Sequence, residues 1–395
     1  MIHNAYSTDG FIRIMRKVIF SIFAVGFLLL LVISLREFQR PAEIIGKDTE
    51  RVITENCLRS FGIPLLSYTY MITPVEKEFP LAFSLQVYTH PERVIRLLLA
   101  IHRPHNLYCV HVDAKSSKQY EQMLILAAEC IGPNIFFVPD HQRTKVRWGY
   151  FTELEPDLTC SRLLLARGKR WKYWINLTGQ EFPIRTNLEL VLALRALNGT
   201  NLVEAIYRNR YIERLPPEGA VDLNITWFKG SVHVVVRREF VEYMNNDNKA
   251  QQLLVALKAH ESRANREIFP DEAFFPTLNH NPHVFKIPGA FLGTHEETVT
   301  GMIQRLKIWK ISGEPCGSGR FIRFICMLGI GDLPRLFTAP NFFANKFMPD
   351  IEPIAYDILE FWLASKTAFE AVHGVPHSSF NLSYYATHVM AWNHL

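Results

Sequence analysis

The 395-residue sequence lacks several patterns that commonly identify a protein's partner. Its net charge of +5 is spread along the chain and never gathers into a basic run, so the footprint of a nucleic-acid-binding protein is missing. It also has no internal repeat and no low-complexity tract. Because no linker-like segment interrupts residues 57–395, we expect them to form one domain.

Motifs for metals and dinucleotides are missing as well. No Asp-x-Asp pair stands at the end of an expected strand, and the 15 histidines are scattered without convincing ligand spacing. We therefore expect no metal and no other cofactor. The segment Gly329-Ile330-Gly331 lacks the third glycine and the following helix of a dinucleotide-binding fingerprint.

One long apolar run is present, from Val18 to Leu35, and it contains no charge. A helix over these 18 residues spans about 27 Å, which is close to the hydrocarbon thickness of a bilayer. Basic residues precede the run, so the positive-inside rule predicts a cytoplasmic tail (1–17), a transmembrane signal-anchor (18–35), a stem (36–56) and a lumenal domain (57–395). A cleaved signal peptide is the alternative, but this run is longer than the usual apolar core and a poor cleavage site follows it.

All six cysteines lie on the predicted lumenal side, where thiols oxidise: Cys57, Cys109, Cys130, Cys160, Cys316 and Cys326. Their even number and the lack of a C-x-x-C pair favour disulfides over zinc, but about fifteen pairings are possible and the sequence selects none. Asn198 and Asn224 begin glycosylation sequons beside polar or turn-forming residues. Asn176 begins a sequon in an apolar run and is expected to be buried, and Asn381 begins a fourth.

Predicted strands and helices alternate along the chain. Apolar runs predict strands at 82–88, 107–112, 135–138 and 172–177, with helices at 91–101, 119–128, from 152 and at 188–197. Thr152 and Thr186 each precede a glutamate by three residues, which predicts capping boxes. Beyond a loop after Gly199 we expect a strand at 231–236 and a helix at 238–259. This order predicts an α/β domain with a mostly parallel sheet, whose ligands bind beyond the carboxyl ends of the strands.

Three sets of residues could carry chemistry. Asp113 ends an expected central strand, where it could contact a ligand or only cap a turn. Asp271 and Glu272 stand among aromatic residues, where a carboxylate could act as a general base or only complement a helix dipole. Arg323 and Lys346 could neutralise a departing diphosphate or be ordinary surface charges.

Five ordered segments are more specific than any single residue. They are RLLLAIHRP (96–104) leading into YCVHVD (108–113), WKYWINLTGQEFPI (171–184), PDE (270–272), GDL (331–333) and FANKF (343–347). Together they resemble the core-2/I-branching β-1,6-N-acetylglucosaminyltransferase family (glycosyltransferase family 14), which includes the peptide O-xylosyltransferases. The resemblance covers the chain from about Cys57 to near Phe361.

This resemblance implies a GT-A-like, Rossmann-type nucleotide-sugar-binding domain in a Golgi membrane protein of type II topology. It also implies a UDP-sugar donor, with UDP-GlcNAc as the default, inversion at the anomeric carbon and no metal. Glu272 would be the base that deprotonates the 6-hydroxyl of an O-glycan on a glycoprotein acceptor. Arg323 and Lys346 would stabilise the leaving diphosphate, and Gln86 and Asp113 would lie against the nucleotide.

The family's disulfides would map onto three pairs, Cys57–Cys130, Cys109–Cys160 and Cys316–Cys326. Two departures are visible, because Thr178 stands where the branching enzymes have a free thiol and the cysteines of a further long-range bridge are missing. The acceptor loop, 204–227, is shorter than in the branching enzymes. We assign Glu204 to hydrogen-bond an acceptor sugar and Trp309 to stack on it.

The donor stays open, because UDP-glucose or UDP-xylose would use the same base and diphosphate-binding residues. The acceptor and a possible homodimer stay open as well. A catalytically inactive, membrane-anchored glycan-binding protein is the alternative from another functional class. The joint presence of Glu272, Arg323 and Lys346 argues against it, since a binding protein needs no base.

Overall fold

The computed structural model describes residues 57, 71–208, 210–293 and 302–395, which belong to one compact unit, Thr54–Leu395. The predicted cytoplasmic tail, signal-anchor and stem lie outside the described residues. Within the described ranges, no helix is both long enough and apolar enough to cross a membrane.

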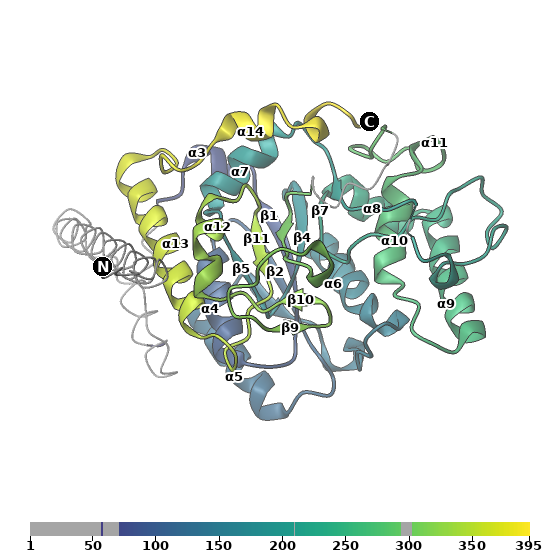
Figure 1. Ribbon diagram of the computed structural model, residues 1–395, viewed down its shortest axis with the longest axis horizontal. Helices are drawn as coiled ribbons and strands as arrows, with labels where there is room; N and C mark the ends of the chain where they lie inside the picture. The colour runs from purple at the N-terminus through teal and green to yellow at the C-terminus, as the bar shows by residue number, and fades with distance from the viewer. Residues whose placement is uncertain (1–56, 58–70, 209, 294–301) are drawn as a thin grey trace, which may run out of the picture. The chain divides into compact units, whose positions relative to one another are not determined.

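Helices and strands alternate through the first half of this unit (Figure 1). The strands are β1 (Leu81–Val87), β2 (Leu107–Val112), β3 (Ile135–Phe137), β4 (Tyr173–Thr178), β5 (Glu181–Pro183), β6 (Leu202–Val203), β7 (Val234–Arg237), β8 (Arg305–Leu306), β9 (Phe321–Ile322), β10 (Ile325–Cys326) and β11 (Phe343–Asn345). The α-helices are α3 (Pro74–Lys77), α4 (Pro91–Ile101), α5 (Lys118–Ile131), α6 (Glu155–Arg167), α7 (Asn187–Ala196), α8 (Arg238–Asn246), α9 (Asn248–Ala264), α10 (Asp271–Asn279), α11 (Pro282–Phe285), α12 (Leu333–Thr338), α13 (Ile354–His373) and α14 (Leu382–Ala386).

A six-stranded sheet with the order β3-β2-β1-β4-β7-β6 forms the centre. Its first four strands in that order run parallel, whereas β7 is antiparallel to β4 and β6 is antiparallel to β7. The predicted α/β class with a mostly parallel sheet is therefore confirmed. The strand order reverses between β1 and β4, which is where open α/β sheets bind ligands.

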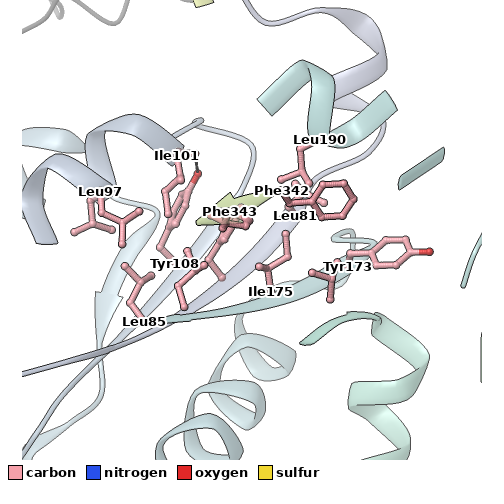
Figure 2. Close-up of a cluster of buried hydrophobic side chains, with 14 of the residues drawn as sticks. Leu81, Leu85, Leu97, Ile101, Tyr108, Tyr173, Ile175, Leu190, Phe342 and Phe343 are labelled. Carbon is pink, nitrogen blue, oxygen red and sulfur yellow. Dashed lines mark hydrogen bonds between the residues drawn. The ribbon is translucent and has the colours of Figure 1, made fainter. Parts of the chain in front are cut away.

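Side chains of the central strands alternate between two apolar cores. Leu81 and Leu85 of β1 join Leu97 and Ile101 of α4 in the first core, which Figure 2 shows. Ala82 of the same strand belongs to the second core, with residues of α6, α8 and α10. Both faces of the sheet are thus covered, which explains why its parallel strands are almost uniformly apolar.

A smaller three-stranded sheet, β5-β11-β8, adjoins the centre and packs beneath α13 in a third core. Buried ion pairs hold α13 to the rest of the unit. Lys366 of α13 pairs with Glu189 of α7, and Glu360 of α13 pairs with Arg96 of α4. Beside this sheet, β9 and β10 form a hairpin with a two-residue turn.

Two predictions of helix boundaries are wrong. The sequence predicts one helix over 238–259, but α8 ends at Asn246 and α9 begins at Asn248, because the Asp247 carboxylate accepts the Lys249 N–H at 2.7 Å and caps a new helix. Thr152 does not cap α6. It lies in a 3₁₀ turn, and its hydroxyl oxygen accepts the Arg147 N–H instead. The predicted capping box at Thr186 is confirmed.

The structure contains the three disulfides that the resemblance implies, Cys57–Cys130, Cys109–Cys160 and Cys316–Cys326. Among the sequons, Asn198, Asn224 and Asn381 are exposed. Asn176 is buried as expected, and its amide donates to the Asp157 carboxylate at 2.7 Å.

Candidate functional site

The candidate site lies beyond the carboxyl ends of β1 and β4. Gln86 stands near the end of β1, in register with Thr178 at the end of β4. Its side-chain amide donates to the Glu153 carbonyl at 3.5 Å. Gln86 therefore connects the end of the sheet to the 3₁₀ turn at Phe151–Glu153.

Arg323 occupies the tip of the β9–β10 hairpin. Arg323 and Phe324 form the two-residue turn, with φ values of 49° and 65°. Residues other than glycine adopt this left-handed conformation at a cost in conformational energy. Backbone hydrogen bonds brace the hairpin from the segment before it, since Lys310 N–H donates to the Phe324 carbonyl at 2.8 Å. The Arg323 guanidinium rests 4.0 Å from the ring centroid of Trp148. The second basic residue, Lys346, directly follows β11.

Glu153 interacts electrostatically with these two basic residues. Its carboxylate accepts the Gly149 N–H at 2.6 Å. The pKa of Glu153 is raised to about 6, mainly by burial and also by the charge of Glu272, while the Gly149 N–H, Arg323 and Lys346 oppose the shift. Burial also lowers the pKa of Lys346, with Arg323 acting in the same direction. Arg323 and Lys346 thus both act electrostatically on the Glu153 carboxylate.

The segment that carries Gly149 also holds the start of α10. The Gly149 carbonyl accepts the N–H groups of Ile268 and Phe269, both at 2.9 Å. Gly149 itself has φ of 78°, and a Cβ atom there would lie 2.6 Å from the Glu267 side chain. Trp148 packs edge-on against Phe269 with a centroid distance of 4.8 Å. The Arg323 hairpin and the base of α10 are therefore linked through one tryptophan.

Asp271 and Glu272 open α10 but lie in different environments. Asp271 is 3% exposed, and its Oδ1 has no hydrogen-bond partner in the described part of the chain. Burial raises the pKa of Asp271 well above its usual range, and the charges of Glu153 and Glu272 add to this shift. The Glu272 side chain is 25% exposed, and its Oε2 lies 3.1 Å from Lys229 Nζ. Of the two acids, Glu272 is therefore the more accessible to solvent.

Glu204 and Trp309, which were predicted to bind an acceptor, line the same small cavity of about 50 Å³. The other lining residues are Ser231, Met302, Gln304, Arg305 and Lys307. Lys307 Nζ donates to the Ser231 hydroxyl at 3.1 Å and lies 5.7 Å from the Trp309 ring centroid. Burial raises the pKa of Glu204, while Lys307 and Lys229 oppose the shift and Glu272 adds to it. Glu204, which lines the cavity, therefore interacts electrostatically with Glu272.

Asp113 lies at the carboxyl end of β2, as predicted, but it forms a turn. Its Oδ1 accepts the Lys115 N–H at 2.8 Å, and its Oδ2 lies 3.5 Å from Lys115 Nζ. No hydrogen bond or ion pair between described residues joins Asp113 to the group around Glu153. The described residues also contain no set of three His, Cys, Asp or Glu side chains arranged to hold a metal ion.

Sequence reasoning missed three residues of this site. Glu153 falls in the acidic stretch that was interpreted as a capping box. Trp148 and Lys229 stand in no motif, and only their contacts with Arg323 and Glu272 reveal them. Since each contact joins segments far apart in the chain, no local pattern in the sequence could have indicated it.

The chain is similar to known proteins over most of its length. Residues 81–337 match the profile of the Core-2/I-Branching enzyme family. A beta-1,3-galactosyl-O-glycosyl-glycoprotein beta-1,6-N-acetylglucosaminyltransferase 4 from Danio rerio is 32% identical over 83% of this chain and 80% of its own length. A Homo sapiens protein named beta-1,3-galactosyl-O-glycosyl-glycoprotein beta-1,6-N-acetylglucosaminyltransferase is 32% identical, covering 75% of this chain and 73% of its own. A Mus musculus N-acetyllactosaminide beta-1,6-N-acetylglucosaminyl-transferase is also 32% identical, covering 75% and 77%.

Proposed function

Because the chain belongs to the Core-2/I-branching enzyme family of glycosyltransferases, we propose that it transfers GlcNAc from UDP-GlcNAc to the 6-hydroxyl of an O-glycan on a glycoprotein. The carrying observation is that Trp148 links the Arg323 guanidinium to Phe269, just before the helix that carries Glu272. In this proposal the domain is GT-A-like, and the protein is a single-pass type II protein of the Golgi membrane with its catalytic domain in the lumen.

The reaction is a single displacement. Glu272 accepts the proton of the acceptor hydroxyl as its oxygen attacks the anomeric carbon from the face opposite the diphosphate. The bond between that carbon and the phosphate oxygen breaks, and UDP departs with the electron pair. One displacement inverts the anomeric configuration. Arg323 and Lys346 neutralise the charge that develops on the leaving diphosphate.

The proposed mechanism uses no metal. A guanidinium and an ammonium at the diphosphate supply the positive charge that a divalent cation supplies elsewhere. Asp113, the acid best placed at a strand end, already lies beside the Lys115 ammonium. Its proposed role is to contact the nucleotide together with Gln86.

The acceptor would enter from the cavity lined by Glu204 and Trp309. A sugar ring stacks on an indole face, and a carboxylate accepts hydrogen bonds from sugar hydroxyls. The Gly230 N–H donates to the Glu272 carbonyl and the next residue, Ser231, lines this cavity, so a sugar bound there would lie toward the base.

The test is UDP release by the full-length protein in detergent, with EDTA present, over a panel of UDP-GlcNAc, UDP-glucose and UDP-xylose. A Galβ1,3GalNAc peptide serves as the acceptor. We expect turnover in EDTA with UDP-GlcNAc. Turnover with another donor would correct the sugar, and turnover only after a divalent cation is added would refute metal independence. Absence of both turnover and UDP binding in folded protein would favour the membrane-anchored glycan-binding alternative.

A further inference from the structure

Lys229 is held against Glu272 by both its backbone and its side chain. Lys229 forms an isolated β-bridge with Ile206. The backbone N–H of the next residue, Gly230, donates to the Glu272 carbonyl at 2.7 Å. The side chain reaches the same residue, with 3.1 Å between Lys229 Nζ and Glu272 Oε2. The two side chains are 16% and 25% exposed, so the pair is partly shielded from solvent screening.

Three carboxyl groups interact electrostatically with Glu272. Asp271 precedes it, and Glu153 and Glu204 interact with it electrostatically. Burial raises the pKa of each of these three carboxyl groups. A second ammonium, Lys307, acts on Glu272 from the acceptor cavity.

Among the described residues, Lys229 is the cation in direct contact with Glu272. A general base must be ionised before it can accept a proton. An ammonium 3.1 Å from a carboxylate oxygen favours the ionised form of that carboxylate.

We propose that Lys229 is a positioning residue that keeps Glu272 ionised and directs its second oxygen toward the acceptor hydroxyl. This inference rests on the proposed function. Lys229 contacts Oε2, and no hydrogen bond between described residues involves Oε1, which leaves Oε1 to take the proton. Lys229 also acts on Glu204, so it connects the base to the acceptor cavity.

The proton balance is consistent with this role. When Oε1 takes the acceptor proton, Glu272 becomes neutral and the ammonium loses its counter-charge. Lys229 Nζ still donates to the Gly230 carbonyl at 3.2 Å, and it still faces Glu204. The ammonium therefore keeps a partner after the transfer and restores the ion pair when Glu272 releases its proton.

The experiment compares Lys229→Met, Lys229→Gln and Lys229→Arg in the full-length protein. For Lys229→Met we expect kcat to fall by about 10- to 100-fold, since a displaced catalytic group commonly costs that much. The acid limb of the pH-rate profile should move to higher pH, and UDP affinity should stay unchanged. Lys229→Gln, which keeps a donor without charge, should show the same pH shift, and Lys229→Arg should restore the profile.

The matched control is Lys258→Met, which removes a lysine that pairs with Glu155 at 3.8 Å and should leave kcat and the pH profile unchanged. Lys229→Met or Lys229→Gln with a kcat within about twofold of the parent and an unshifted profile would overturn the proposal. If Lys229→Met does not fold, Lys229→Gln alone decides. Glu272→Gln distinguishes a failure of the proposed base from a failure of the role of Lys229. Activity retained in Glu272→Gln would refute Glu272 as the base. Activity lost in Glu272→Gln but unaffected in Lys229→Gln would refute only the role of Lys229.

Discussion

Glu153 provides a sharp test of the electrostatics at this site, because its carboxyl group is buried beside the charge of Glu272. The substitution is Glu153→Gln, which keeps the shape of the side chain. The amide oxygen can still accept the Gly149 N–H, which lies 2.6 Å from the carboxylate. Glu153 is not fully buried, so the new NH₂ group can reach water. What changes is the charge.

The magnitude follows from the shift in pKa. Burial raises the pKa of Glu153 from 4.5 to about 6. The folded state therefore binds more protons than the unfolded state between these values, and stability falls as pH rises through them. Above pH 6 the ionised carboxylate lowers the free energy of unfolding by about 2 kcal/mol, since one pKa unit corresponds to about 1.4 kcal/mol. Glu153→Gln should raise the free energy of unfolding by about that amount at pH 7.5 and leave it nearly unchanged at pH 4.

The assay is urea denaturation of parent and variant at pH 4, 5.5 and 7.5, followed by intrinsic fluorescence. The gain should grow with pH and level off above about pH 6.5. A variant that is less stable than the parent at all three pH values would refute the reasoning. It would mean that the contacts of the carboxylate stabilise the fold more than its buried charge destabilises it. The same variant should bind UDP more tightly at pH 7.5, since an anion beside Arg323 and Lys346 is gone.

Three further predictions concern the fold around the site. Lys366→Met leaves the buried Glu189 carboxylate without its ammonium partner, so the free energy of unfolding in urea titration should fall by about 3–5 kcal/mol. A loss below about 1 kcal/mol would contradict a stabilising role of this buried ion pair. Trp148→Ala removes the ring under the Arg323 guanidinium and should weaken UDP binding by about 2- to 30-fold in calorimetry, because cation–π contacts contribute about 0.5–2 kcal/mol; unchanged affinity would show that the ring does not orient Arg323. Cys316→Ser opens a disulfide with a sequence separation of 10 and should cost about 3 kcal/mol in thermal or urea unfolding, a prediction that equal stability of the parent and variant would contradict.

Much of the fold is encoded in local patterns. The helix at Pro91–Ile101 and the strand at Leu107–Val112 have the predicted bounds, because a proline begins the one and an unbroken apolar run forms the other. The break at Asp247 was missed, because the helical pattern continues on both sides of it and only a side-chain cap divides the two helices.

The site was predictable only in part. Glu272 and Lys346 lie in the ordered motifs and Arg323 is a candidate because of its charge, but none of this shows that Glu153 acts on them. That arrangement depends on how the segment after β3 folds back to the end of β1 and the start of α10. The same holds for Lys229, whose partner is fixed by tertiary packing rather than by spacing in the sequence.

The most direct test of the account is the turnover of Glu272→Gln in EDTA, with UDP affinity measured on the same preparation. A general base contributes about 10²- to 10⁴-fold, so kcat should fall by that factor while UDP binding, which depends on Arg323 and Lys346, stays unchanged. A kcat within about threefold of the parent would contradict the account, because Glu272 could then not be the base.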